Sequence, residues 1–379
     1  MIFYVTISVI LLLASSIAAT VKEQFKNRIY VVMTSVFCLL SVLRFDVGWD
    51  YFAYWLMQVP MEDSLSEILF SKYTDDIDYA EFGRLELLFR LIYYIAAWSE
   101  WRALFFIITG ALTYAFVFAG IKRCSLDIYS SFFVYLAFNY LLSLGGVRQA
   151  LAVAISFYAI HCVMERKKVA FLLLICLAGL AHRSAWIMII LYPLYYMFSL
   201  KTVAIGCGAV LCIGSLLKTF LYQTMSYSVY GDMEMQGGSI MIWFNVALFV
   251  AACWLVFKYS PKEELQQNVR LLKIAMIGVV LPFIFGGHLG IRCSAYFNIF
   301  YVILIPNVLR NLWERQKYLR ICFYFLCCSY FIFSLWWSSR SEQKAPYVPY
   351  RCVLFTDTTK WKEGTFDNLS KAYMDRVLK

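Results

Sequence analysis

Long apolar runs separated by short polar segments extend from the first residues to about residue 337. Runs of about 17 to 25 residues suit helices that cross the roughly 30 Å hydrocarbon core of a membrane. A membrane barrel would instead show short segments of alternating polarity. The pattern therefore predicts an all-α, polytopic integral membrane protein.

The predicted spans number about twelve. They are 3–19, 29–43, 103–120, 128–144, 147–163, 169–181, 184–199, 202–217, 240–257, 271–287, 292–309 and 319–337. No basic segment precedes the first run, so we interpret it as a spanning helix rather than a cleaved signal peptide. The segment 85–98 is too short and too close to the next run to cross, and we expect a re-entrant or interfacial helix there.

Basic clusters fall on alternate loops, for example at 121–123 and 165–168. Short basic loops face the cytoplasm, so the acidic or nearly uncharged loops between them, and both termini, are predicted to lie outside. This topology gives one transmembrane bundle over 1–337, with an external loop at 44–84, and an external C-terminal tail at 338–379.

The composition agrees with the pattern, since 62% of the residues are hydrophobic and 15% are charged. Such values exclude an ordinary soluble domain and a disordered chain. The formal net charge of +10 is explained by cytoplasmic loops that meet anionic lipid and by a basic tail, so no nucleic-acid partner is implied. Most of the twelve cysteines lie inside predicted spans, where cysteine acts as a small apolar residue, and no metal or cofactor motif is recognisable.

Polar residues that conflict with their apolar surroundings collect at the predicted outer ends of the spans. A charged side chain at bilayer depth costs about 2.5 to 3.5 kcal/mol, so each one is a candidate functional residue. Four hairpin tips carry them: Arg44, Asp46 and Asp50; Arg148 and Gln149; His182 and Arg183; and His288 and Arg292.

The spacing at two of these tips favours an anionic ligand. Gly145 and Gly146 end one helix directly before Arg148, and a glycine pair likewise precedes Arg292. Free backbone N–H groups at a helix start and a guanidinium group then point to the same place, which suits a phosphate or diphosphate.

Other residues at this level could supply a base or bind a sugar. Asp46 and Asp50, with Glu86 nearby, or His182, could accept a proton from a sugar hydroxyl. Tyr51 and Tyr54 could stack on sugar rings. Simpler interpretations compete with each of these: a helix-end arginine is often an interfacial anchor, and the acidic stretch 75–78 is better explained as a solvated loop than as a divalent-ion site.

The order of the tips resembles the EpsG family of Wzy-like polysaccharide polymerases. The matching segments are "RFDVGWDYFAYW", "LELLFRLI", "GGVRQALAVAI", "HRSAW", "IRCSAYF" and "YVPYR". The resemblance implies a bacterial inner-membrane enzyme that assembles O-antigen, capsule or exopolysaccharide. Such an enzyme moves the growing chain from undecaprenyl diphosphate onto the next lipid-linked repeat unit at the outer face of the membrane, where its active site faces the periplasm.

The resemblance also implies a metal-independent glycosyltransferase mechanism. Arg148 and Arg292 would stabilise the negative charge on the leaving diphosphate. Asp46 or His182 would act as the base, and Arg44 would bind the second diphosphate or orient the acidic pair. The remaining expected substrate-binding residues are Asp50, Tyr51, Tyr54, Glu86, Gln149, Arg183, His288 and Tyr296.

Two rival functions remain. A ligase that moves a finished glycan from the same carrier would need the same arginines. A flippase or transporter would be expected to carry ionisable residues near the middle of the membrane and often an inverted repeat, which the sequence does not show. Family association adds a chain-length regulator and a flippase as expected partners, alongside the lipid-linked oligosaccharides and the membrane lipid.

Overall fold

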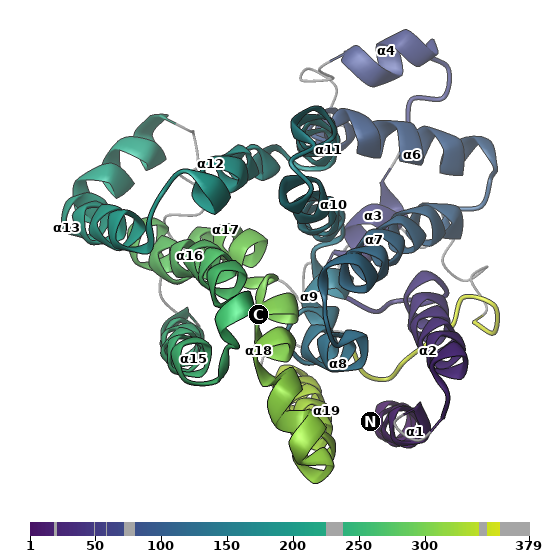
Figure 1. The fold of residues 1–379 in the computed structure, drawn as a ribbon. Helices are drawn as coiled ribbons and strands as arrows, with labels where there is room; N and C mark the ends of the chain where they lie inside the picture. Colours follow the sequence, from purple (N-terminus) through teal and green to yellow (C-terminus); the bar gives the residue numbers. More distant parts are fainter. Residues whose placement is uncertain are drawn as a thin grey trace.

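The computed structural model describes residues 1–18, 21–48, 50–57, 59–71, 80–224, 238–340 and 347–356. Apart from one isolated bridge between Arg44 and Cys352, the described secondary structure is entirely helical, as the sequence predicts (Figure 1). The acidic stretch 75–78 lies outside the described residues.

The described residues of the first half of the chain form eleven helices. These are α1 (Ile2–Ala18), α2 (Glu23–Val42), α3 (Tyr51–Leu56), α4 (Leu65–Phe70), α5 (Ala80–Gly83), α6 (Leu87–Trp98), α7 (Ala103–Cys124), α8 (Ile128–Phe138), α9 (Tyr140–Gly145), α10 (Val147–Met164) and α11 (Lys168–Ala181). The second half continues with a 3-10 helix, η1 (Arg183–Ile190), and then α12 (Leu191–Tyr196), α13 (Leu200–Thr224), α15 (Gly238–Tyr259), α16 (Lys262–Phe285), α17 (Gly287–Asn298), α18 (Tyr301–Arg315) and α19 (Lys317–Arg340).

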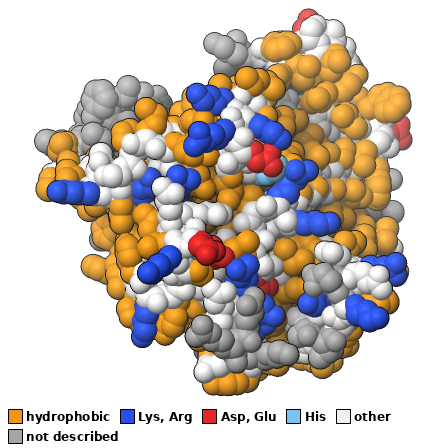
Figure 2. Space-filling view, viewed as in Figure 1, with side chains coloured by type: hydrophobic (Ala, Val, Ile, Leu, Met, Phe, Trp, Pro, Cys, Tyr) orange, Lys and Arg blue, Asp and Glu red, His pale blue; other side chains and the backbone are white. Residues whose placement is uncertain are grey.

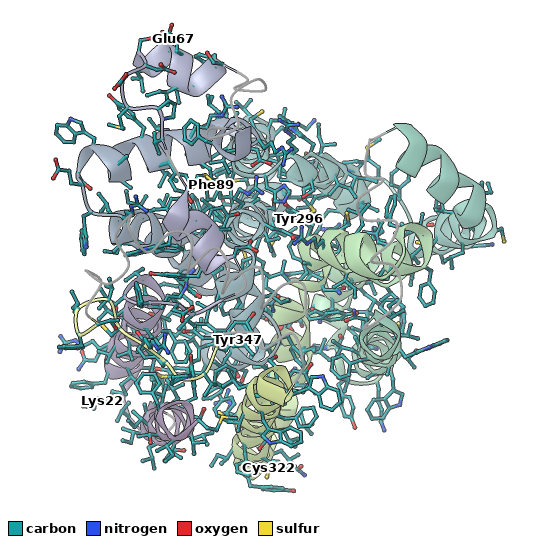
Figure 3. The ribbon with its side chains drawn as sticks, turned by 180° about the vertical axis from the view of Figure 1, so that it is seen from behind. Lys22, Glu67, Phe89, Tyr296, Cys322 and Tyr347 are labelled. Carbon is teal, nitrogen blue, oxygen red and sulfur yellow. The ribbon has the colours of Figure 1, made fainter. Side chains whose placement is uncertain are left out.

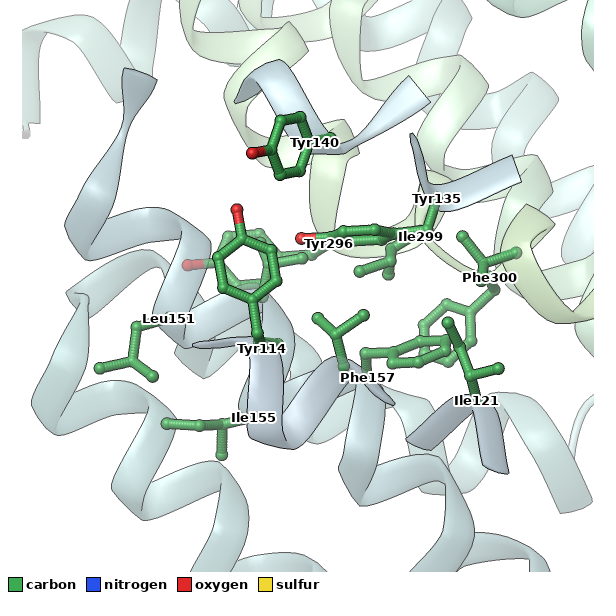
Figure 4. Close-up of a cluster of buried hydrophobic side chains, with 14 of the residues drawn as sticks. Tyr114, Ile121, Tyr135, Tyr140, Leu151, Ile155, Phe157, Tyr296, Ile299 and Phe300 are labelled. Atoms are coloured by element: carbon green, nitrogen blue, oxygen red, sulfur yellow. The ribbon is translucent and has the colours of Figure 1, made fainter. Parts of the chain in front are cut away.

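Helix α10 lies near the middle of the bundle and contacts α7, α9, α11 and α17 (Figure 1). Of the helices long and apolar enough to span a membrane, it has the largest buried share, 67%. Figure 4 shows Leu151, Ile155 and Phe157 of this helix among buried side chains of its neighbours, and the centroid of the Phe157 ring lies 5.8 Å from that of Phe300. The helix that begins at the predicted outer tip of Arg148 is therefore anchored by the core of the protein.

The expected number of about twelve spans is not confirmed. Within the described residues six helices are long and apolar enough to cross a membrane, or up to seven if a bent pair counts as one span. The six lie in α2, α7, α10, α15, α16 and α19. The described residues also form shorter apolar helices: Ile2–Ala18, Ile128–Phe138, Lys168–Ala181 and Leu200–Gly214 lie at predicted spans, and Leu87–Trp98 lies in segment 85–98.

The difference has a physical cause, because an apolar run does not guarantee an unbroken helix. The predicted span 128–144 is interrupted at Asn139, between α8 and α9. The predicted span 184–199 becomes η1 followed by α12, and the helices of 292–309 form a pair bent by 42°. Each break leaves pieces shorter than the length that a straight crossing needs.

Segment 85–98 forms the short helix α6, which packs beside α7 and α11. Its 12 residues extend about 18 Å at 1.5 Å per residue, too little to cross the hydrocarbon core. A short helix is what the sequence predicts here, and its position relative to the membrane stays a prediction.

The described part of the C-terminal segment, 347–356, packs against the bundle. The backbone N–H of Phe45 donates to the carbonyl of Arg351 at 2.9 Å, and that of Val353 donates to the carbonyl of Leu43 at 2.8 Å. At the start of this segment, the Tyr347 hydroxyl donates to the carbonyl of Leu141 at 3.1 Å. Figure 3 shows Tyr347 lying over the bundle near its middle, in the view from behind.

Candidate functional site

Glu86 is the centre of a polar network at one end of the bundle. Its Oε2 accepts a hydrogen bond from Nη1 of Arg148 at 3.0 Å, and its side chain is 7% exposed. Its Oε1 accepts from the backbone N–H of Arg183 at 3.3 Å and lies 3.6 Å from Nδ1 of His182. One buried carboxylate therefore joins α6, the start of α10 and the turn between α11 and η1.

Arg148 is held in place on two sides. Its Nε donates to the Tyr54 hydroxyl at 2.9 Å, in addition to the bond to Glu86. The backbone carbonyl of Tyr54 in turn accepts from the Tyr93 hydroxyl at 3.0 Å, which ties α3 to α6. Because the Arg148 side chain stays 31% exposed, its guanidinium group is oriented and still open to an anionic ligand.

His182 is the N-cap of η1, and its ring is fixed by Ser184. Nδ1 of His182 lies 3.4 Å from both the backbone N and the Oγ of Ser184, and that Oγ lies 3.0 Å from the Tyr296 hydroxyl. Because Nδ1 faces a backbone N–H donor, this contact favours the neutral tautomer with its proton on Nε2.

Burial lowers the pKa of His182 below its ordinary value, and the positive charges of Arg148, Arg292 and Arg183 add to this. The carboxylate of Glu86 opposes the shift without cancelling it. The imidazole is therefore neutral at neutral pH, and its contact with Glu86 is not a salt bridge in that state.

Asp50 and Arg292 complete the site. Burial raises the pKa of Asp50, while Arg292 and Arg148 act in the opposite direction, so both cations lie close to this carboxylate. Among the described residues no hydrogen-bond donor reaches the Asp50 carboxylate. The Arg292 side chain is exposed, and the Gln149 amide donates to its backbone carbonyl, which joins the start of α10 to the middle of α17.

The turn that carries Asp50 needs a glycine at position 48. Gly48 has a φ of +111°, and a Cβ there would lie 2.0 Å from the carbonyl oxygen of Leu144. Without a side chain the turn presses against α9, and the Asp50 N–H donates to the carbonyl of Gly145 at 3.2 Å. Close backbone contact thus places Asp50 beside the start of α10.

Arg44 and Tyr51, expected to bind substrate, and Asp46, expected as a base, have packing partners in the structure. Arg44 is buried, and it donates from Nε to the carbonyl of Val47 at 3.0 Å and from Nη1 to that of Ser41 at 2.6 Å. Asp46 is also buried, with Oδ2 2.7 Å from Nη1 of Arg351. Tyr51 is 0% exposed and stacks on Phe106 at a centroid distance of 4.0 Å, so it has no free face for a sugar.

The other predicted residues divide between site and support. Tyr54 and Tyr296 are buried, and their hydroxyl groups contact Arg148 and Ser184. Arg183 is exposed near Glu86. His288 lies in the first turn of α17, and its side chain is outside the described residues. The structure thus brings together Asp50, Glu86, Arg148, Gln149, His182, Arg183 and Arg292.

Sequence reasoning gave no role to Ser184 or Arg90. Ser184 contacts the His182 ring, as described above. Arg90 donates to the carbonyl of Leu85 at 3.0 Å and to that of Leu69 at 3.1 Å, which holds the chain just before Glu86. A charged residue one turn after Glu86 in an apolar helix was the available signal. No group of three or more metal-ligating side chains occurs among the described residues.

Residues 27–352 match the EpsG family. The chain belongs to the EpsG family. Its members are membrane proteins of the Wzy-like polysaccharide polymerase type, so the family predicted from the short motifs is confirmed. No curated protein and no solved structure matches the chain. The family and the apolar helices together identify a multi-pass membrane protein of polysaccharide biosynthesis.

Proposed function

We propose that this EpsG-family protein is a polysaccharide polymerase. It transfers a growing glycan from a polyprenyl diphosphate, of the undecaprenyl type, onto the next lipid-linked repeat unit at the outer face of the bacterial cytoplasmic membrane. The observation that carries the proposal is the network in which buried Glu86 orients Arg148, with Arg292 and His182 beside it.

The leaving group of this reaction is a diphosphate, which gains negative charge as its bond to the anomeric carbon breaks. Arg148 is oriented before the substrate arrives, because Glu86 and Tyr54 hold two of its nitrogen atoms. Arg292 supplies a second, exposed cation on the neighbouring helix. Fixed cations at the place where charge develops stabilise the transition state without reorganisation.

The acceptor must lose a proton as its hydroxyl oxygen forms the new bond to the anomeric carbon. His182 is suited to accept this proton because it is neutral at neutral pH, and its Nδ1 lies 3.6 Å from Oε1 of Glu86, whose charge would stabilise the imidazolium. Asp50 is the alternative base, since its carboxylate faces both arginines and has a raised pKa.

Arg44 and Asp46 are assigned here to the support of the site rather than to substrate. Both are buried, and their side chains hold the turn after α2 and the C-terminal segment. Gln149 and Arg183 are suited to contact substrate or to fix the helix starts, since each is joined to the network through a backbone group.

The test is the length distribution of surface glycan, run as a gel ladder, in a host with the gene deleted and then restored. Restoration with Arg148→Ala or Arg292→Ala should leave single repeat units and no ladder. Arg28→Ala, which removes an exposed arginine at the first turns of α2, is the matched control and should restore the full ladder.

Other outcomes separate the rival functions. Long chains that stay on their lipid carrier after deletion would indicate a ligase. Repeat units that never reach the outer face would indicate a flippase or transporter. A normal ladder from Arg148→Ala protein that inserts into the membrane would contradict the assigned mechanism. Arg148 would then act only as an interfacial anchor.

A further inference from the structure

A second group of cations lies at the other end of α10, around three tyrosines of α12. Tyr192, Tyr195 and Tyr196, called here the tyrosine platform, have neighbouring ring centroids 5.3 Å apart (Tyr192–Tyr196) and 4.9 Å apart (Tyr195–Tyr196). Tyr196 is fixed through its hydroxyl, which donates to the carbonyl of Val163 at 2.9 Å. The end of α10 thus holds the platform in place.

Three cations surround the platform and are called here the platform cations: Arg166, Lys168 and Arg270. The guanidinium carbon of Arg270 lies 5.1 Å from the Tyr195 ring centroid and 5.2 Å from that of Tyr196. That of Arg166 lies 5.2 Å from Tyr196, and Nζ of Lys168 lies 5.6 Å from Tyr192. The loop after α10, the start of α11 and the first half of α16 therefore converge on one spot.

The carboxylates near this spot are engaged elsewhere. Glu165 lies 2.6 Å from Nζ of Lys167 and 3.3 Å from Nε2 of His161, and Glu264 is bound to Arg310 at 2.8 Å. Within the described part of the chain, none of the platform cations forms an ion pair. Figure 2 shows Lys and Arg side chains gathered over the area of α10 to α12, with few acidic side chains among them.

Exposed apolar side chains continue directly from these cations. On α11 they are Val169, Leu172 and Leu173, which share one face of the helix, and Leu172 lies one turn after Lys168 on the same side. Val169 is 72% exposed, and Met197, just after the platform, is 73% exposed. Unpaired cations next to an exposed apolar face match a molecule with an anionic head and hydrocarbon chains.

We propose that the platform cations bind the phosphate of an anionic phospholipid, whose acyl chains lie along α11. The tyrosine rings keep the three cations together by cation–π contact while leaving their N–H donors for phosphate oxygens. This site differs from the candidate active site, because the 18 residues of α10 separate Arg148 from Arg166 by about 27 Å at 1.5 Å per residue. The basic cluster at 165–168 predicts that this end faces the cytoplasm, where anionic lipid is expected.

The test uses the purified full-length protein in nanodiscs of phosphatidylcholine with increasing amounts of phosphatidylglycerol. Bound phosphatidylglycerol is counted by native mass spectrometry, and the thermal midpoint is measured in parallel. Each cation near an anionic surface contributes about fivefold in affinity, so the triple variant Arg166→Gln, Lys168→Gln, Arg270→Gln should bind roughly a hundredfold more weakly. The single variant Lys168→Gln changes an exposed residue at a helix start and should lose about fivefold in affinity for phosphatidylglycerol. It tests the proposal even if the triple variant fails to fold.

The matched control is the triple variant Lys22→Gln, Arg28→Gln, Lys122→Gln. It removes the same charge from exposed positions just before α2, on α2 and on α7, respectively. It should bind phosphatidylglycerol as the parent does. Equal losses in the control and the triple variant would overturn the site in favour of general surface charge. An equal rise in thermal midpoint with inorganic phosphate alone would overturn the lipid assignment, and binding unchanged in Lys168→Gln and in a folded triple variant would overturn the proposal.

Discussion

The chemistry of the candidate site depends on a few side chains, and the Glu86 carboxylate determines how they are arranged. It is the one carboxylate within hydrogen-bond distance of Arg148 and close to His182 in the described structure. Its charge acts on both neighbours, since it orients a guanidinium group and raises the proton affinity of an imidazole. Removing that charge without changing the shape of the side chain tests both effects.

Glu86→Gln should lower the pKa of His182 further, because the Glu86 carboxylate raises it while burial and the arginines lower it. The chain contains only three histidines, so selective labelling with NMR titration can follow each ring. Glu86→Ala offers the comparison in which shape is lost as well. A His182 pKa that rises in Glu86→Gln would contradict the arrangement described here.

The same shift predicts the pH dependence of activity. His182 accepts a proton only while it is neutral, so activity should be retained at neutral pH and fall as the pH drops through its lowered pKa. The acid limb of the rate profile should therefore lie below about 6.5, the ordinary histidine value. Polymerisation in proteoliposomes measures it, and a limb that persists unchanged in His182→Gln would assign the base to Asp50 instead.

At the scale of elements, the site depends on how the turn after α2 meets α9 and α10. Gly48 lets the backbone reach within contact of Leu144, and the N–H of Asp50 then bonds to Gly145. The sequence contains this glycine between Asp46 and Asp50, but only the fold shows that its missing side chain allows a close approach between two segments.

Gly48→Ala should destabilise the protein by about 1 to 3 kcal/mol, because it adds a steric clash to a positive φ that favours glycine. It should also move Asp50 away from α10 and reduce activity. The thermal midpoint in detergent and the glycan ladder measure the two effects. The control is Gly208→Ala in α13, where a new Cβ meets nothing within 4 Å and no loss of stability is expected.

At the scale of the whole molecule, segment 347–356 packs against α1 and the turn after α2. The ion pair between Arg351 and buried Asp46, 2.7 Å apart, lies beside the backbone bridge between Arg44 and Cys352. The hydroxyl of Tyr4 in α1 also donates to the carbonyl of Tyr347 at 2.8 Å. The segment 347–356 therefore stabilises the same turn that positions Asp50.

Arg351→Gln should lower stability by about 1 to 3 kcal/mol, because it removes a charged partner from a buried carboxylate. Thermal unfolding in detergent measures the loss. Adding Asp46→Asn should recover part of it, since the remaining group is then neutral. If the double variant is less stable than Arg351→Gln by the full amount that Asp46→Asn costs on its own, the two residues act independently.

Much of the site was predictable because it depends on topology. Alternating basic loops place the tips of several hairpins on one side of a membrane, and this brought Arg148, His182 and Arg292 together in the prediction. The direction of each side chain was not predictable. Arg44 and Asp46 occupy the same tip as Asp50 but turn into the packed interior, and a single step along a helix or turn is enough to reverse that choice.

The sequence by itself determined that this is a helical membrane protein, its family and the side of the bundle on which its polar residues gather, because hydrophobicity and loop charge act locally along the chain. Tertiary structure alone decided which apolar runs form unbroken helices, that Glu86 is the centre of the site, and that the C-terminal segment packs against the turn after α2. These depend on contacts between residues far apart in sequence, such as Arg148 with Glu86 and Arg351 with Asp46.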